Sequence, residues 1–195
     1  MGKRSTMGLE IYREEYKTNR YVVVKNTLDK ETLECLSDYI FQEYSNGNTH
    51  KQSEPTNNMS DCLYMGEPFR KILLKLLPSV EAIVEKFLLP SYSYTRIYRK
   101  GDVLRKHTDR RACEFTISLC VSKCSNAPWL FNIERKDKSV IGIDLNPGDF
   151  LLIAGRELTH WREELKSDWQ VQSFFHYVDY YGEYRDHIWD RNLIF

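Results

Sequence analysis

The stretch that decides the fold is Ser91-Tyr-Ser-Tyr-Thr-Arg-Ile-Tyr-Arg99, which is followed by the turn Lys100-Gly-Asp102. Its aromatic and β-branched residues favour a strand, and the glycine-containing turn ends that strand. The same pattern of a short apolar strand and a turn continues further along the chain. The other expected strands are 114–122, 129–134, 139–143, 150–154 and 169–178. Many short, regularly spaced strands are typical of a β-sandwich or a barrel.

The N-terminal part of the chain has a different periodicity. A strand is expected at 21–25, and Asp29 is expected to cap a helix that ends near Tyr44. A second helical stretch runs from about residue 68 to 88, with Pro78 as a break or a kink. Helical elements therefore precede the main run of strands.

This order of elements predicts the architecture. We expect one α+β, mainly β domain over residues 1–195, built as a double-sheeted jelly roll with its helices on one outer face. The N-terminal strand and helical support is expected at about 20–90 and the β core at about 91–180.

Composition limits the partners and the compartment. The 28 Lys and Arg residues balance 28 Asp and Glu residues, so net charge gives no general attraction to nucleic acid or to an acidic membrane. The five cysteines include no Cys-x-x-Cys pair, which argues against a disulfide framework and for a reducing compartment. No stretch resembles a signal peptide or a membrane span. We therefore expect a cytoplasmic protein with neither nucleic-acid nor membrane partners.

A metal site is predicted where Leu104-Arg-Lys-His-Thr-Asp109 follows the first turn. In an extended chain, residues i and i+2 point to the same face, so His107 and Asp109 can meet one ion. His160 follows the strand expected at 150–154 and supplies a third ligand. Two imidazoles and one carboxylate form a facial triad with open positions, which suits non-haem Fe(II).

The His-x-Asp pattern alone is weak, because exposed His and Asp often lie two residues apart by chance. Two observations favour a real site: the parts of the triad border separate strands, and the turn Asn146-Pro-Gly-Asp149 precedes the second part. The other histidines, His50, His176 and His187, have no such setting. His176 lies among aromatic residues and is predicted to be structural.

These residues also resemble a known family. The stretch Tyr98-Arg-Lys-Gly-Asp-Val-Leu-Arg-Lys-His-Thr-Asp109 is similar to the approach to iron in prolyl 4-hydroxylase-type 2-oxoglutarate oxygenases. Leu145-Asn-Pro-Gly-Asp-Phe150, followed by Gly155 and His160-Trp-Arg-Glu163, is similar as well. The resemblance covers about residues 20–180. It implies a double-stranded β-helix, which is a cupin-like barrel, with Fe(II), 2-oxoglutarate and O2, and the release of succinate and CO2.

The resemblance also implies where 2-oxoglutarate binds, and here the chain departs from the family. The family has a basic residue for the distal carboxylate on the last barrel strand, where this chain has the neutral Gln170. Arginine is favoured for this role because its fork binds both oxygens of a carboxylate. Arg162 is the best substitute, because it lies two residues past His160. Tyr98 matches the family tyrosine that donates to the co-substrate. The remaining expected lining residues are Ser118, Cys120 and Gln172.

Alternatives remain open for this pocket. Arg162 could instead pair with Glu163 or Glu164 at the surface, and the glutamines could satisfy polar groups of the core. Weaker candidates for the carboxylate anchor are Lys166, Arg156, Arg96 and Arg99.

The substrate is expected near Arg110, Glu114 and Trp161, which adjoin the ligands. Arg110 is positioned to bind a carboxylate or a carbonyl of the substrate, although a solvated surface charge is the ordinary alternative. The polar segment 46–58 is predicted to be a loop and a candidate lid.

The predicted function is hydroxylation of an unactivated carbon in an amino acid, a prolyl peptide or a small natural product.

One alternative is a nucleic-acid demethylase on the same fold. It would need a basic face and arginines on the last strand, and residues 169–178 include no arginine. Another is a non-catalytic, cupin-like barrel that holds a ligand or a structural metal. Structural zinc sites usually have four protein ligands, which a triad with an open face does not match. The substrate, the choice between hydroxylation, desaturation and cyclisation, and the oligomeric state stay open.

Overall fold

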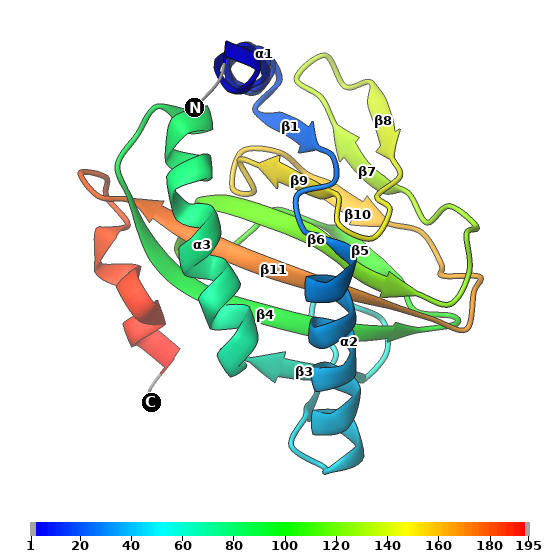
Figure 1. Ribbon diagram of the computed structural model, residues 1–195. Coiled ribbons are helices and arrows are strands. Elements are labelled where there is room, and N and C mark those ends of the chain that lie inside the picture. The colour runs from blue at the N-terminus through cyan, green and yellow to red at the C-terminus, as the bar shows by residue number, and fades with distance from the viewer. Residues whose placement is uncertain (1–2, 194–195) are drawn as a thin grey trace.

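The computed structural model describes residues 3–193, and the side chains of residues 9–190, as two β-sheets with helices on one side (Figure 1). The helical elements are α1 (Lys3–Asn19), α2 (Lys30–Ser45), α3 (Glu67–Val84) and the 3₁₀ turns η1 (Arg111–Cys113) and η2 (Arg185–Leu193). The strands are β1 (Tyr21–Val24), β2 (His50–Gln52), β3 (Ser60–Tyr64), β4 (Leu88–Arg99), β5 (Leu104–His107), β6 (Phe115–Lys123), β7 (Phe131–Glu134), β8 (Val140–Ile143), β9 (Phe150–Ile153), β10 (His160–Arg162) and β11 (Trp169–Asp179).

The two sheets differ in size and share no strand. The larger has seven strands in the order β1-β9-β6-β11-β4-β3-β2, and the smaller has four in the order β5-β10-β7-β8. All the pairs within both sheets are antiparallel. The chain is thus mainly β with a few helices, as the sequence predicts.

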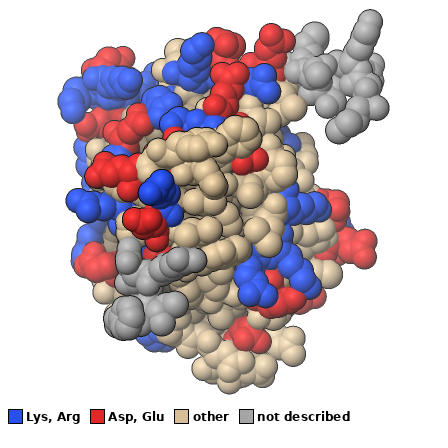
Figure 2. All heavy atoms as spheres, turned by 90° about the vertical axis from the view of Figure 1, so that its left-hand side faces the viewer, with Lys and Arg blue, Asp and Glu red and all other residues tan. Residues whose placement is uncertain are grey.

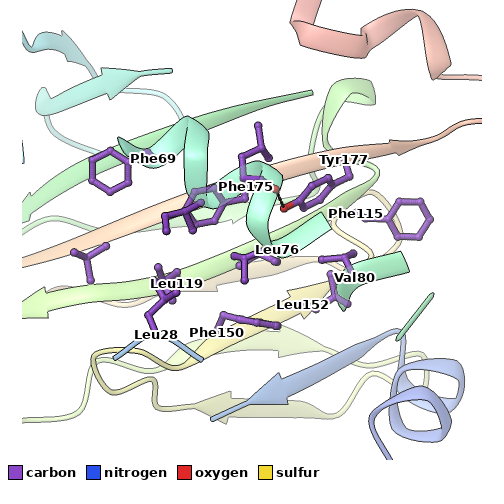
Figure 3. Close-up of a cluster of buried hydrophobic side chains, with 14 of the residues drawn as sticks. Leu28, Phe69, Leu76, Val80, Phe115, Leu119, Phe150, Leu152, Phe175 and Tyr177 are labelled. Carbon is purple, nitrogen blue, oxygen red and sulfur yellow. Dashed lines mark hydrogen bonds between the residues drawn. The ribbon is translucent and has the colours of Figure 1, made fainter. Parts of the chain in front are cut away.

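Strand β11 shows how the large sheet divides two environments. Val171, Phe175 and Tyr177 belong to the core cluster that includes the helices, and the Tyr177 hydroxyl donates to the Leu73 carbonyl at 2.8 Å. Figure 3 shows Leu76 of α3 in the same cluster as Phe175 and Tyr177. Because side chains alternate along a strand, the residues between them face the other way, toward the smaller sheet.

A second core cluster fills part of the space between the sheets. Leu104, Phe131 and Ile133 of the small sheet pack with Leu151 and Ile153 of the large one. These side chains leave one end of the inter-sheet space to polar and aromatic residues, and that end becomes the functional site.

Local signals place the helices close to where the sequence predicts them. The Asp29 carboxylate accepts a hydrogen bond from the Thr32 backbone N–H at 2.8 Å, which confirms it as the cap of α2. Helix α3 continues through Pro78 and ends at Val84, so the expectation of a helical stretch to residue 88 was wrong. Strand β4 starts at Leu88 instead, because the left-handed Glu85 ends the helix.

Several elements were not expected from the sequence. Helix α1 precedes β1 and packs on α3, where the Arg13 side chain donates to the Ala82 carbonyl at 2.6 Å. Strand β2 lies inside the segment 46–58 that was expected to be a loop, and it pairs with β3. The N-terminal segment therefore extends the large sheet, through β1 at one edge and β3 and β2 at the other.

Within the described residues, no helix is both long and apolar enough to cross a membrane.

The packing of α3 on the sheet yields a stability prediction. Leu73 is fully buried, whereas its neighbour Leu74 is 46% exposed. We expect Leu73→Ala to lower the free energy of unfolding by about 2–5 kcal/mol, because it leaves a cavity beneath the helix. Leu74→Ala has the same change in helix propensity and is the matched control, with an expected loss below about 1 kcal/mol. Urea unfolding measures both, and equal losses would contradict this packing.

Candidate metal centre

The pairing of β5 with β10 brings the two predicted histidine ligands together. His107 and His160 are direct partners across this antiparallel pair, and their ring centroids are 4.3 Å apart. Asp109 follows two residues after His107, and its Oδ1 lies 3.6 Å from His107 Nε2 and 3.5 Å from His160 Nε2. The three ligand atoms lie within 4.8 Å of one another. One ion can therefore reach all three.

Hydrogen bonds orient the ligand atoms toward that common point. The Nδ1 atoms of His107 and His160 lie 2.7 and 2.9 Å from the carbonyl oxygens of Arg105 and Leu158. Because a carbonyl only accepts, each Nδ1 carries the proton and each Nε2 keeps a free lone pair. The Phe131 ring stacks on the His160 ring at 5.1 Å and further restrains it.

The carboxylate of Asp109 is held in an equally defined way. The Thr116 hydroxyl donates to its Oδ2 at 2.8 Å, which leaves Oδ1 for the histidine side. The Asp109 backbone N–H donates to the Gly155 carbonyl at 2.9 Å. A Cβ at residue 155 would lie only 2.0 Å from Oδ2 of Asp109, so the close approach requires glycine. Gly155 was part of the family resemblance, and the structure now gives it a physical reason.

Asp109 keeps its negative charge at neutral pH. Burial by itself would raise its pKa, but when the triad histidines are protonated, the charge of His160 and hydrogen bonds from both rings hold the pKa of Asp109 far below its ordinary value. The carboxylate is therefore ionised over the whole physiological range. A buried carboxylate beside two imidazole lone pairs favours a bound cation.

A second group of potential ligands shares Asp109 and adds Cys113 and His176. Burial raises the pKa of the Cys113 thiol well above its ordinary value, so the thiol stays protonated near pH 7, and it contacts the Tyr92 hydroxyl at 3.1 Å. Burial also lowers the pKa of His176 to about 4, and its Nδ1 is 3.0 Å from the Thr116 hydroxyl. Because cysteine binds metals as the thiolate, this group is the poorer metal site.

The triad opens into a cavity of about 730 Å³ between the sheets. This volume lies in the range of small-molecule sites. Of the residues predicted to contact co-substrate or substrate, Tyr98, Ser118 and Arg110 line the cavity, whereas Arg162, Cys120, Gln172, Glu114 and Trp161 do not. The sequence did not single out Tyr64, Tyr92, Tyr94, Thr116 or Phe174, which also form its wall. Tyr92, Tyr94 and Tyr98 lie an even number of residues apart on β4, so they share one face of the strand. This spacing is the sequence signal that could have identified Tyr92 and Tyr94 as part of the wall.

Arg162 is buried behind the cavity wall and is only 1% exposed, so the surface-pairing alternative was wrong. Its guanidinium lies over the rings of Trp129 and Phe131, at 4.6 and 5.2 Å, and its Nη1 donates to the Trp129 carbonyl. Its Nη2 has no partner, and Arg162 forms no ion pair with any described residue. Burial lowers the pKa of Arg162 to about 10, so it still carries its charge at neutral pH.

The two glutamines and Cys120 lie on the large sheet, and Cys120 is near enough to Arg162 on the small sheet for each to influence the pKa of the other. The Oε1 of Gln172 accepts from the Ser118 hydroxyl at 3.4 Å, but its Nε2 has no partner. Gln170 Nε2 donates to the Cys120 sulfur at 3.8 Å, and burial raises the pKa of Cys120 to about 11. Cys120 therefore packs as a neutral thiol in the inter-sheet core.

All three predicted substrate residues have partners within the chain. The Glu114 carboxylate accepts from the Asp179 backbone N–H at 2.9 Å. The Trp161 indole donates to the Glu163 carboxylate at 2.8 Å, and Lys106 lies over its ring. Arg110 alone lines the cavity, where it pairs with Asp190.

The segment 46–58 forms a tethered part of the cavity wall. The buried Arg96 donates to the carbonyls of Gln52 and Glu54, at 3.3 and 3.0 Å, and to the Thr56 hydroxyl at 2.6 Å. The sequence also suggested Arg96 as a weaker candidate for the carboxylate anchor, but these contacts already occupy its guanidinium. Gln52 and Glu54 line the cavity, so the segment contributes directly to its shape.

Comparison with known proteins places this geometry in a structural context. No family model and no curated protein matches the sequence. Among solved structures, the α-ketoglutarate-dependent epimerase SnoN from nogalamycin biosynthesis is similar, with a TM-score of 0.76 and 12% identity over 89% of this chain and 83% of that one.

Two further structures are similar over most of their length. A prolyl hydroxylase from Trichoplax adhaerens, in complex with a hypoxia inducible factor peptide, has a TM-score of 0.75 and 12% identity over 92% of this chain and 94% of that one. A 2OG-Fe(II) oxygenase family oxidoreductase from Burkholderia pseudomallei has a TM-score of 0.74 and 9% identity over 87% and 90%. The chain has the fold of the 2-oxoglutarate/Fe(II) oxygenases. At the level of the fold, the resemblance inferred from the sequence is confirmed.

The close approach of Gly155 to Asp109 gives a test of the triad geometry. We expect Gly155→Ala to weaken Mn²⁺ binding by about tenfold or more, because the added methyl displaces the Asp109 carboxylate. Gly142→Ala is the control: its methyl would meet the flexible, exposed Leu130 side chain on the small sheet, away from the triad. Electron paramagnetic resonance of free Mn²⁺ measures both affinities. Unchanged binding in Gly155→Ala would contradict this arrangement.

Proposed function

We propose that the protein is a cytoplasmic, Fe(II)- and 2-oxoglutarate-dependent dioxygenase, a single double-stranded β-helix domain that hydroxylates an unactivated carbon. The observation that carries this proposal is the convergence of His107 Nε2, His160 Nε2 and Asp109 Oδ1 at the wall of one cavity. All five cysteines are free, which supports a reducing compartment.

The donor set fits Fe(II) better than a structural metal. Two neutral imidazoles and one carboxylate on one side of the site would leave positions on the cavity side for other ligands. A structural zinc site would need a fourth protein ligand. The neighbouring thiol of Cys113 is protonated and bonded to Tyr92, so it is a poor candidate. The non-catalytic barrel is therefore the weaker interpretation.

Unpartnered polar atoms support 2-oxoglutarate as the co-substrate. Arg162 Nη2 and Gln172 Nε2 are both buried without a hydrogen-bond partner, and a buried donor that stays unpaired is costly. Neither residue lines the cavity itself, but each contacts a residue that does: the Arg162 guanidinium lies over the Phe131 ring, and Gln172 accepts from the Ser118 hydroxyl. A carboxylate held by Arg162, with Gln172 and Tyr98 nearby, would neutralise the buried charge.

In this proposal the positive charge for the co-substrate comes from a different strand than in the related family. Gln170 is neutral at the position on the last strand where the related family has a base, and Arg162 supplies the charge from β10 in the opposite sheet. Tyr98 and Arg162 stay close because both pack on Trp129, with distances of 4.8 and 4.6 Å to its ring.

The chain's own contribution is positioning. When bound, iron, 2-oxoglutarate and O2 would together supply the oxidising chemistry, with O2 as the oxidant and 2-oxoglutarate oxidised to succinate and CO2. The protein would hold the reacting groups and exclude water. Thr116 holds the Asp109 carboxylate, and the carbonyls of Arg105 and Leu158 hold the histidine rings.

The substrate is proposed to be a small molecule or a peptide side chain. SnoN is described in complex with nogalamycin RO, HygX from Streptomyces hygroscopicus with hygromycin B, and the prolyl hydroxylase with a peptide. The cavity of about 730 Å³, with Tyr64, Tyr92, Tyr94 and Phe174 in its wall, has room for such groups.

A nucleic-acid substrate has less support. Strand β11 contains no arginine that could bind a phosphate backbone. Figure 2 shows Lys and Arg interspersed with Asp and Glu around an uncharged centre on the face in view. That face lacks the basic patch that phosphate binding would favour.

The triad assignment predicts complete dependence of turnover on its ligands. We expect His107→Ala and Asp109→Ala to abolish succinate formation, because two remaining ligands do not hold Fe(II) in a facial arrangement. Succinate release from 2-oxoglutarate with a panel of amino acids and prolyl peptides measures this. Asp38→Ala changes an exposed acid on α2 and should keep the activity of the unchanged protein. Turnover in either triad variant at the unchanged rate would refute the assignment.

The co-substrate assignment predicts that a change at Arg162 weakens 2-oxoglutarate binding without weakening Fe(II) binding. We expect Arg162→Met to weaken 2-oxoglutarate binding by about tenfold to a hundredfold, the range for one lost charge-assisted bond, with Fe(II) binding kept. Replacing a buried, unpaired charge by an apolar side chain should not unfold the protein. Anaerobic titration of the visible charge-transfer band measures the affinity. Lys166→Met, at an exposed position, is the control, and an unchanged affinity in Arg162→Met would exclude Arg162 as the anchor.

A further inference from the structure

Two residues that line the cavity already bind a carboxylate, and this carboxylate belongs to the chain itself. Asp190 is 0% exposed, and its two oxygens accept from Nη1 and Nη2 of Arg110 at 2.9 and 2.5 Å. The Tyr64 hydroxyl donates to the same carboxylate at 3.0 Å. A guanidinium fork with an added hydroxyl donor is the geometry by which proteins bind free carboxylates.

The groups that hold this carboxylate are part of the cavity. Arg110, Tyr64 and Tyr92 all line it, and Arg110 directly follows the triad residue Asp109. The Arg110 Nε donates to the Tyr92 hydroxyl at 3.2 Å, and its guanidinium lies 4.5 Å above the Tyr92 ring. Tyr64 stacks on Tyr92 at 5.3 Å. Tyr64 lies on β3, Tyr92 lies on β4 and Arg110 immediately precedes η1, so this platform of three residues comes from elements other than the segment that carries Asp190.

Asp190 reaches the platform from outside the sheets. It belongs to η2, the C-terminal segment that lies beside them in Figure 1. The helical geometry of η2 is broken at Ile188, and Trp189 and Asp190 have φ values of 53° and 47°. Left-handed backbone is uncommon for residues other than glycine, so this position of Asp190 is held against a local preference.

We propose that Arg110, Tyr64 and Tyr92 form a carboxylate-binding subsite for the substrate, and that Asp190 fills it as an internal competitor until substrate arrives. The inference rests on the proposed function and narrows its substrate class to small organic acids. The carboxylate of the acid replaces that of Asp190 on Arg110. The rest of the acid then extends into the cavity toward the triad, because Arg110 adjoins Asp109.

The strained backbone makes this exchange reasonable. An incoming carboxylate regains the two guanidinium bonds and the tyrosine bond, while the chain at Trp189 and Asp190 is released from its left-handed conformation. A substrate without an anionic group cannot replace these bonds and would leave Arg110 without its charge partner.

The test uses the full-length protein without metal and a pair of probes that differ only in charge. Benzoate has a carboxylate and a flat ring that can lie against Tyr92, and benzamide has the same shape without the charge. Calorimetric titration compares the unchanged protein with Asp190→Ala and Asp190→Asn. Removal of the competitor should raise benzoate affinity about tenfold or more, if the subsite is free less than about one-tenth of the time. Benzamide affinity should not change.

Controls separate this site from other effects. Asp186→Ala removes an exposed acid of the same segment and should leave benzoate binding unchanged. Arg110→Gln added to Asp190→Ala should abolish the gain, which separates this site from binding at Arg162. In the unchanged protein, benzoate should also increase hydrogen exchange in residues 185–193, because it displaces the segment.

The outcomes that overturn the inference are distinct. Equal benzoate affinity in the unchanged protein, Asp190→Ala and Asp190→Asn would refute the competitor role, and an equal gain for benzamide would refute carboxylate recognition. A tripeptide with a free C-terminus tests a peptide source, and a gain seen for it alone would overturn the assignment to small acids. None of these measurements needs iron, 2-oxoglutarate or turnover, so their failure is distinguishable from a failure of the proposed oxygenase activity.

Discussion

The pairing of β5 with β10 is the constraint on which the rest of the site depends. It sets His107 directly opposite His160, and Asp109 joins them two residues further on, where its backbone N–H donates to the Gly155 carbonyl. Neither strand is long, so the pair is held by its neighbours: β7 on one side of β10 and the inter-sheet core beneath Leu104. Weakening that core would disturb the relative placement of the ligands before it disturbed any single ligand.

The large sheet provides both the face that packs on the helices and most of the cavity wall. Its helix-covered face is apolar and packs against α2 and α3, while its other face carries tyrosines, Ser118 and Thr116 around the cavity. Because side chains alternate along β4 and β11, apart from a register shift between His176 and Tyr177, the same strands produce both faces. A rigid platform of this kind positions ligands and carboxylate-binding groups more accurately than loops do.

Two buried arginines near this cavity differ in their hydrogen-bond partners. Arg96 satisfies its donors on carbonyls and hydroxyls of residues 52–56, which indicates a structural role. Arg162 lies behind the cavity wall and keeps an unpaired Nη2, which is why we propose it as the anion-binding residue. The number and type of satisfied donors thus distinguish the two arginines, although both are almost fully buried.

The sequence by itself determined the mainly β class, most strand positions and the cap at Asp29, because these follow from local periodicity and turn chemistry. It also predicted the three residues that the fold brings together as a candidate triad. The tertiary structure alone decided that Arg162 is buried, that Cys120 packs in the core and that Asp190 reaches Arg110. A period of two shows which residues share a face, but it does not show which strand or terminal segment will lie opposite. The short, polar β2 left no apolar pattern to detect, so its pairing with β3 also emerged only from the fold.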